Sequence, residues 1–226
     1  MGKYASAVVK QIQAWIGYNE YDGDHKKIID LYNSQRVLPR GYKVKYTDEW
    51  CATTVSSVAV KLGYTDIIPT ECSCGKMIEK AIIMGIWMEN DAYVPSPGDI
   101  IMYDWGDVGS GNGKKDWATH DCKGWADHVG IVERVANGKI TVIEGNYSRE
   151  VKRRLLDING RYIRGFICPR YDLEEVPKVD GELLQEVAKA VIRGEWGNGA
   201  NRKARLEAAG FNYEDVQKIV NKLVKK

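Results

Sequence analysis

A cysteine in a setting typical of a nucleophile occurs in the segment Asp48-Glu49-Trp50-Cys51-Ala52. Apolar residues after it are spaced i, i+3, i+4 and i+7, which predicts a helix over residues 52–62 that ends at Gly63. Cys51 is therefore expected in the first turn of this helix. There the helix dipole and the unpaired backbone N–H groups favour a thiolate and lower the thiol pKa. The alternative is a small core residue at the start of the helix.

A thiolate nucleophile needs a base, and the sequence contains three histidines. His25 lies in a charged helical segment, which predicts a surface position, and His120 lies in an irregular loop. His128 begins the apolar pattern of residues 128–132, which predicts a strand that would hold the imidazole rigidly. Because a lone histidine on a strand is commonly just a hydrogen-bonded polar residue, the assignment of His128 depends on its neighbours.

Two candidate partners for His128 stand at the end of the next predicted strand, in Ile143-Glu144-Gly145-Asn146. Glu144 and Asn146 are two residues apart, so their side chains share one face of an extended chain. Either group, placed beside His128, would fix the orientation and the tautomer of the imidazole. In the order cysteine, histidine, acid, these residues form a papain-like constellation.

The register between the two strands depends on the loop at residues 136–138. A two-residue turn would direct Glu144 and Asn146 to the face opposite His128. A three-residue loop shifts the pairing by one residue and places Asn146 opposite His128. Glu144 then lies opposite Gly130 on the same face. The chemistry requires the second register, so we predict the three-residue loop.

The elements that must position these residues follow one another in a simple order. Helical spacing of apolar residues occurs first, over residues 4–16, 26–32, 52–62 and 75–84. Strand patterns follow, over residues 99–104, 128–135, 139–144, 151–155 and 162–168. Helices before strands predict an α+β fold in which N-terminal helices pack on an antiparallel sheet. The Gly-, Asp- and Lys-rich residues 106–127 are expected to form a long loop.

The composition narrows the class of protein. The 226 residues carry 33 Lys and Arg against 31 Asp and Glu, a net charge of +2, which excludes a strongly basic nucleic-acid footprint. No run of about 18 apolar residues occurs, so no membrane span is expected. Five cysteines, an odd number in a long chain, do not suggest a disulfide framework. A reducing compartment at synthesis fits better.

The sequence changes character near residue 171. Residues 172–181 are acidic, polar and interrupted by Pro177, which predicts a linker. Residues 182–226 have helical patterns over 183–193, 203–209 and 213–223, and they carry nine Lys and Arg against six Asp and Glu. We therefore predict a catalytic domain over 1–171, a linker over 172–181 and a small three-helix binding module over 182–226.

Two other motifs give weaker hypotheses. Cys72-Ser73-Cys74 with His120-Asp121-Cys122 would be a zinc site, but neither spacing is the CxxC of structural zinc, so no metal site is assigned. Residues 109–115 are only superficially like a phosphate-binding loop, because Val108 and Lys115 occupy positions where the motif needs Gly and Ser or Thr. The pattern leaves open the roles of four cysteines: Cys72, Cys74, Cys122 and Cys168.

Four motifs of the first domain together resemble the CHAP domain. This is the cysteine, histidine-dependent amidohydrolase/peptidase module of phage lysins and bacterial wall hydrolases, and it is related to the NlpC-type peptidases. The motifs come in the family order: Asp48-Glu49-Trp50-Cys51-Ala52, Pro97-Gly98-Asp99-Ile100, Asp127-His128-Val129-Gly130-Ile131-Val132 and Ile143-Glu144-Gly145-Asn146. The resemblance spans residues 15–171.

The resemblance implies a papain-like fold and cleavage of amide bonds in peptidoglycan. Carried over by motif, Cys51 is the nucleophile, His128 the general base and Glu144 the residue that orients His128. Asn146 matches a polar position near the family's site. Some CHAP domains bind calcium through an acidic loop ahead of the cysteine, but Tyr21-Asp22-Gly23-Asp24 does not align well enough to assign one. No cofactor is therefore assigned, and calcium binding stays an open alternative.

The tail resembles the three-helix cell-wall-binding repeat at the C-termini of some phage lysins, in residues 186–199 and 202–213. The resemblance implies five wall-binding residues: Trp196, Asn198, Gly199, Arg202 and Arg205. Trp196 would stack on a sugar ring, and the two arginines would meet a muropeptide carboxylate. The alternative is that Trp196 fills the core of a small bundle.

These motifs lead us to expect a phage-type endolysin that cleaves a cell-wall amide bond, either N-acetylmuramoyl-L-alanine or a bond within the peptide. Its partner would be bacterial peptidoglycan, with no nucleic acid and no membrane insertion, and the chain would be a monomer or a weak oligomer. The first residues lack a signal-peptide pattern, so the expected location is the host cytoplasm until release and then the wall. The alternative is a non-catalytic wall-binding or adhesion protein on a papain-like scaffold.

Overall fold

The computed structural model describes residues 3–90, 92–106, 124–171, 181–208, 211 and 213–224. They divide into two compact units, Met1–Asp172 and Leu173–Lys226. His120, Cys122 and the glycine-rich residues 109–115 lie outside the described residues, as do residues 172–180 of the predicted linker. Among the described residues, none of the helices combines the length and the apolar character that crossing a membrane requires.

The first unit begins with four α-helices, at the positions that the apolar spacing predicts. They are α1 (Lys3–Gln13), α2 (His25–Asn33), α3 (Cys51–Leu62) and α4 (Cys74–Ile83), with a 3₁₀ turn at Pro39–Gly41. Gly63, with φ of 71°, ends α3 in the left-handed conformation that glycine adopts without strain. The helix therefore starts at Cys51 and stops where the sequence indicates.

A six-stranded sheet follows, with every neighbouring pair antiparallel. Its order is β1-β6-β2-β3-β4-β5. The strands are β1 (Trp87–Met88), β2 (Ile100–Tyr103), β3 (His128–Ala136), β4 (Lys139–Glu144), β5 (Lys152–Asp157) and β6 (Ile163–Ile167). The sequence pattern missed only the short β1. The expected α+β architecture, with N-terminal helices and an antiparallel sheet, is confirmed.

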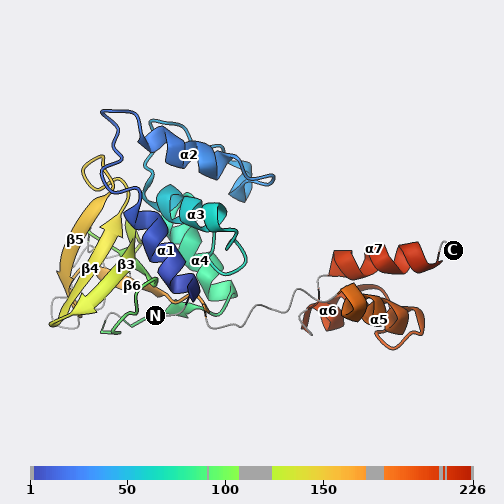
Figure 1. The fold of residues 1–226 in the computed structure, drawn as a ribbon. Helices are drawn as coiled ribbons and strands as arrows, with labels where there is room; N and C mark the ends of the chain where they lie inside the picture. Colours follow the sequence, from blue (N-terminus) through green and yellow to red (C-terminus); the bar gives the residue numbers. More distant parts are fainter. Residues whose placement is uncertain are drawn as a thin grey trace. The chain divides into compact units, whose positions relative to one another are not determined.

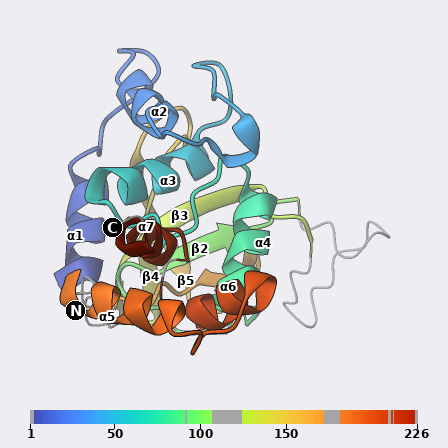
Figure 2. The same cartoon turned by 90° about the vertical axis from the view of Figure 1, so that its right-hand side faces the viewer.

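Helices α1, α3 and α4 lie against one face of the sheet, and α2 packs on α3 (Figures 1 and 2). The main core lies between them and includes Val55 and Val58 of α3 against Val129 and Ile131 of β3. The other face carries a smaller cluster around Tyr103, Val132 and Phe166. Alternate residues of β3 thus enter two different clusters, as expected for a strand with apolar groups on both sides.

The hairpin between β3 and β4 has a two-residue turn, so the predicted three-residue loop is wrong. Ala136 pairs with Lys139 across Asn137 and Gly138. Both turn residues have positive φ, 52° and 72°, the conformation that Asn-Gly favours because it matches the twist of the flanking strands. Local turn chemistry therefore decides the loop length.

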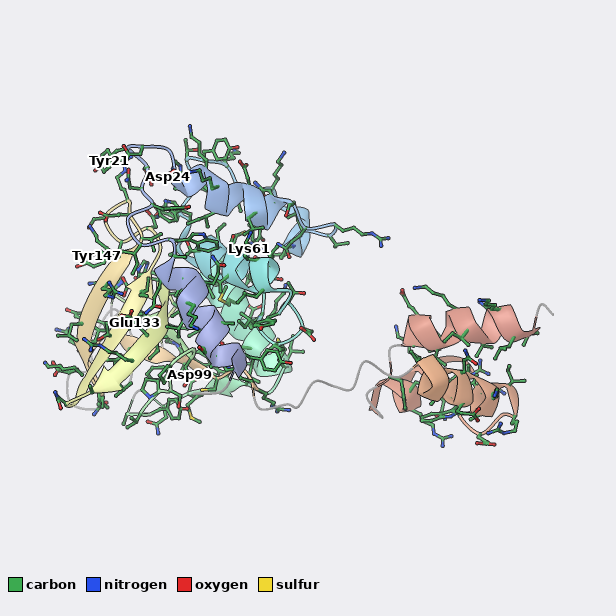
Figure 3. The ribbon with its side chains drawn as sticks, viewed as in Figure 1. Tyr21, Asp24, Lys61, Asp99, Glu133 and Tyr147 are labelled. Atoms are coloured by element: carbon green, nitrogen blue, oxygen red, sulfur yellow. The ribbon has the colours of Figure 1, made fainter. Side chains whose placement is uncertain are left out.

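A β-bulge supplies the one-residue shift that the loop does not. The register changes between Val132 and Arg134, so that Glu133 is the extra residue and Ile131 pairs with Ile143. Glu133, labelled in Figure 3, is held by Arg153 at 2.7 Å and by Gln13 at 2.6 Å. Continued by one residue, this register places Gly130 opposite Glu144, the relationship that the chemistry requires.

The second unit consists, in its described part, of α5 (Gly181–Ile192), α6 (Gly199–Ala208) and α7 (Tyr213–Val224). Its own core is formed by six buried residues: Val187, Ala188, Val191, Leu206, Val216 and Val220. Trp196 and Phe211 pack against this cluster from its edge. A separate apolar core gives this small unit a physical basis for folding by itself.

Candidate active site

Cys51 is the first residue of α3, and the residue before it, Trp50, anchors the start of this helix. Trp50 before it is fully buried, and its indole Nε1 donates to Glu20 at 3.0 Å. The Trp50 carbonyl accepts hydrogen bonds from the backbone N–H and the hydroxyl of Thr54, at 2.9 and 2.8 Å. Because the first N–H groups of a helix have no partner within it, the N–H of Cys51 is available for a developing oxyanion.

His128 and Glu144 are brought together at one end of the sheet, where β3 begins and β4 ends. The His128 Nε2 lies 3.0 Å from a carboxylate oxygen of Glu144, which is completely buried. Gly130 makes room for this carboxylate, because a Cβ there would lie 2.7 Å from the Cγ of Glu144. On its other side the imidazole stacks on the ring of Tyr103, with centroids 5.7 Å apart. The ring of His128 is thus fixed in plane and direction.

Arg154, which the sequence pattern did not single out, completes the surroundings of Glu144. Its Nε lies 2.8 and 2.9 Å from the two carboxylate oxygens. The guanidinium also stacks on Tyr147, 3.8 Å from the ring centroid, and lies 4.6 Å from that of Trp105. Arg154 pairs with Val142, and Glu144 follows Val142 by two residues. The side chains of Arg154 and Glu144 therefore lie on the same face of the sheet. Only the register of β5 could have revealed this neighbour.

The pKa values of this group follow from burial and pairing. Burial raises the pKa of Glu144, but its hydrogen bonds with His128 and Arg154 outweigh that effect and keep the pKa below its ordinary value. Burial alone would lower the pKa of His128, yet hydrogen bonds to Cys51 and Glu144 raise it to about 9. The imidazole is therefore held as imidazolium at neutral pH.

Cys51 has partners on two sides. The Sγ atoms of Cys51 and Cys74 are 3.7 Å apart. This contact and a hydrogen bond with His128 lower the pKa of Cys51 to about 5, although burial acts in the opposite direction. Between about pH 5 and pH 9 the pair is thus a thiolate beside an imidazolium. This is the charge state of an activated cysteine nucleophile with its proton donor in place.

Asn146 lies just beyond β4 and does not continue the strand. Its φ of 59° is left-handed, and its side-chain amide donates to the carboxylate of Glu49. Glu49 is two residues before Cys51, and it borders a pocket of about 290 Å³. The pocket is lined by Arg40, Tyr42, Val44, Asp48, Glu49 and Cys72. The side chain of Asn146 is therefore bonded to a residue two positions before the predicted nucleophile.

No group of three or more His, Cys, Asp or Glu side chains in the described part of the chain is arranged to hold a metal ion. Of the residues in the zinc hypothesis, Cys74 faces Cys51, while His120 and Cys122 lie outside the described residues. In the acidic loop, Asp22 accepts from Asn19 at 2.8 Å and Asp24 pairs with Lys27 at 2.7 Å. Figure 3 labels Asp24 at the start of α2.

The five predicted wall-binding residues lie between α5 and α6 or in α6 of the second unit. Arg202 of α6 bonds back to the loop between α5 and α6. It donates to the Gly197 carbonyl at 2.9 Å and to the Asn198 side chain at 3.1 Å. Trp196 makes an edge contact with Phe211 at 5.9 Å, and the Arg205 guanidinium lies 6.0 Å from the centre of its ring. Trp196 is thus partly a core residue and partly exposed beside a cation.

Comparison with protein-family models finds one match in each part of the chain. The CHAP domain matches residues 41–146, a range that includes all four predicted catalytic residues. The CW_7 repeat matches residues 185–224. A CHAP domain implies peptidoglycan hydrolase activity in general, and a cell-wall-binding repeat indicates targeting to the wall. No curated protein and no solved structure matches the chain.

Proposed function

We propose that this chain is a two-module peptidoglycan hydrolase of the endolysin type that cleaves a wall amide bond with Cys51, His128 and Glu144. The observation that carries the proposal is the His128–Glu144 pair at 3.0 Å, beside a buried thiol at a helix start with a pKa lowered to about 5. We assign the catalytic domain to residues 1–171, the linker to 172–181 and the wall-binding module to 182–226.

The charge state at neutral pH sets the order of the steps. The Cys51 thiolate attacks the amide carbonyl carbon, and the N–H of Cys51 stabilises the negative charge that develops on the oxygen. As the C–N bond breaks, His128 gives its proton to the leaving amine and becomes neutral. Neutral His128 then takes a proton from water, which attacks the thioester and releases the carboxylic acid and the Cys51 thiolate.

Glu144 acts on this sequence through His128. Its buried carboxylate directs Nε2 of the imidazole and stabilises the imidazolium, so the other nitrogen is presented to the thiol. Arg154 keeps the carboxylate charged while it is out of water. Asn146, bonded to Glu49 two residues before Cys51, is assigned a role in placing the substrate.

Turnover of purified bacterial walls tests the catalytic proposal. Wild type should lower the turbidity of the walls, and Cys51→Ala should abolish this, because Cys51 is the only described cysteine whose thiol pKa is lowered. Cys168→Ala, which removes a thiol that lies away from the site, is the matched control and should stay active. Wall binding without turnover in the wild type would instead favour a non-catalytic adhesion protein.

Two further variants separate the roles of the polar residues. Glu144→Gln should fold and keep part of the activity, since it impairs the orientation of His128 while the thiol and the imidazole remain. If Glu144→Gln matched wild type and Asn146→Ala were inactive, the two assignments would have to be exchanged. Mass spectrometry of the products decides the bond. New lactyl-linked sugars indicate the amidase, and new peptide amines indicate the endopeptidase.

A further inference from the structure

A second thiol lies against the nucleophile. Cys51 opens α3 and Cys74 opens α4, and their Sγ atoms are 3.7 Å apart. Both side chains are buried, at 6% and 7% exposure, so water does not solvate the sulfur atoms freely. A thiolate buried in this way needs hydrogen-bond donors to replace water. His128 supplies one such donor, and Cys74 is the other hydrogen-bond partner of the Cys51 sulfur.

The contact is built into the fold by buried polar bonds between α3 and the segment that precedes α4. The Ser56 hydroxyl of α3 donates to the Glu71 carbonyl at 2.6 Å and accepts from the Glu71 N–H at 2.7 Å. Arg40 binds the Glu71 carboxylate at 3.0 and 3.1 Å. The segment that leads into Cys74 is thus fastened to α3 one turn after Cys51. Cys74 is therefore held in a fixed position next to Cys51.

The two thiols differ in their charge. The contact with Cys51, burial and the negative charge of Asp127 raise the pKa of Cys74 well above its usual value. Cys74 and His128 are the titratable groups that face Cys51, and Glu144 faces His128. When Cys51 ionises, Cys74 therefore keeps its proton, and one thiol of the pair is a donor while the other is an acceptor.

We propose that Cys74 is a positioning residue, whose S–H donates a hydrogen bond to the Cys51 thiolate and, together with His128, holds it charged and in place. This inference rests on the proposed hydrolase activity, which it extends by one residue. A purely structural Cys74 would contribute only its volume to the core. The two roles differ in what a substitution does to the ionisation of Cys51.

The experiment measures the rate at which iodoacetamide alkylates Cys51 as a function of pH, with the modified peptide identified by mass spectrometry. The variants are Cys74→Ala, which removes the donor, and Cys74→Ser, which keeps one. We expect the midpoint of Cys51 alkylation to move up by about one pH unit in Cys74→Ala and to return close to the wild-type value in Cys74→Ser. The acid limb of the kcat/KM profile should move with it.

An unchanged midpoint in Cys74→Ala, or an equal shift in both variants, would overturn the proposal. If Cys74→Ala does not fold, Cys74→Ser against wild type carries the test, and a midpoint near that of a free thiol in the serine variant is then the contrary result. Failure of the proposed function is distinguishable. In that case wild type does not turn over walls, although the alkylation midpoint still responds to Cys74.

Discussion

Gly130 of β3 lies against Glu144 of β4 with no space for a side chain between them. A Cβ on Gly130 would come within 2.5 Å of Val142 and 2.7 Å of the Cγ of Glu144. Both contacts are on the side of the sheet where Glu144 meets His128 and Arg154. The absence of a side chain at one position of β3 is therefore what permits a buried carboxylate on its neighbour.

The first prediction concerns Gly130→Ala. Alanine ordinarily suits a strand interior better than glycine does, but here its methyl group must displace Glu144. Displacing a catalytic arrangement by about 1 Å costs about a hundredfold in rate, so we expect kcat to fall by that order while most of the fold remains. Wall turnover and a thermal melt measure the two effects. Gly138→Ala, in the turn of the same hairpin, is the control: alanine is strained at its φ of 72°, so the melting temperature should fall, but turnover by the folded protein should stay unchanged. Full activity of Gly130→Ala would contradict the placement of Glu144.

The second prediction is a bell-shaped dependence of kcat/KM on pH. Activity should rise through about pH 5 as Cys51 ionises and fall through about pH 9 as His128 loses the proton that the leaving amine needs. Measurement on a soluble wall fragment avoids changes in the walls themselves. A single rise near pH 8.5, as for an ordinary thiol, would show that the buried pair is not a thiolate–imidazolium.

The third prediction concerns Arg154→Met. The substitution leaves the fully buried Glu144 charge with His128 alone, and breaking a buried ion pair costs on the order of 3 kcal/mol in unfolding free energy. Arg154 helps to keep the pKa of Glu144 low, so its stabilising effect is present at neutral pH and is lost as acid protonates Glu144. Denaturant unfolding at pH 7 and pH 4 should therefore differ more for wild type than for the variant. Lys139→Met, which removes the same charge from an exposed ion pair with Asp157, is the control and should change stability little at either pH.

Much of this fold can be predicted from the sequence, because helix and strand periodicity are local. The helix that begins at Cys51 and the strand that begins at His128 both follow from spacing and end signals. The predicted three-residue loop is not what brings Glu144 to the face of His128, since Asn137-Gly138 forms the tight turn that its chemistry favours and the shift comes from the bulge at Glu133. No periodic pattern marks such a bulge, because its position depends on the partner strand.

Residues that tertiary packing brings to the site could not be predicted. Cys74 reaches Cys51 only because Ser56 fastens α3 to the segment around Glu71. Arg154 reaches Glu144 through the register of β4 with β5, which the turn after Gly145 determines. The Cβ of a residue at 145 would collide with Thr54 of α3, so that turn is itself placed by helix packing. Such contacts need the structure.

The fourth prediction uses oxidation to report on the distance between the two thiols. Hydrogen peroxide should convert the Cys51 thiolate to a sulfenic acid with release of hydroxide. The Cys74 thiol then attacks this sulfur, forming a Cys51–Cys74 disulfide and releasing water. Activity should be lost and then recovered with dithiothreitol. In Cys74→Ser the sulfenic acid has no partner at 3.7 Å, so continued peroxide should make the loss irreversible. Equal recovery of both proteins would mean that the two sulfur atoms do not meet.

The last prediction is that residues 182–226 bind walls by themselves and that Arg205 contributes more than its charge. This unit has its own apolar core, so the fragment should fold, show no lysis and sediment with purified peptidoglycan. Its excess of basic residues also predicts some non-specific attraction to anionic wall polymers, which salt screens beyond about 8 Å at physiological ionic strength.

Arg205→Ala and Lys222→Ala remove equal charge from exposed positions, but only Arg205 lies over the Trp196 ring. Specific recognition predicts that Arg205→Ala weakens binding more than Lys222→Ala does, and that the difference persists in moderate salt. Trp196→Phe should also weaken binding while keeping the fold, because a smaller ring still packs on Phe211. Equal losses from both charge variants, abolished together by salt, would reduce the module to a basic tether.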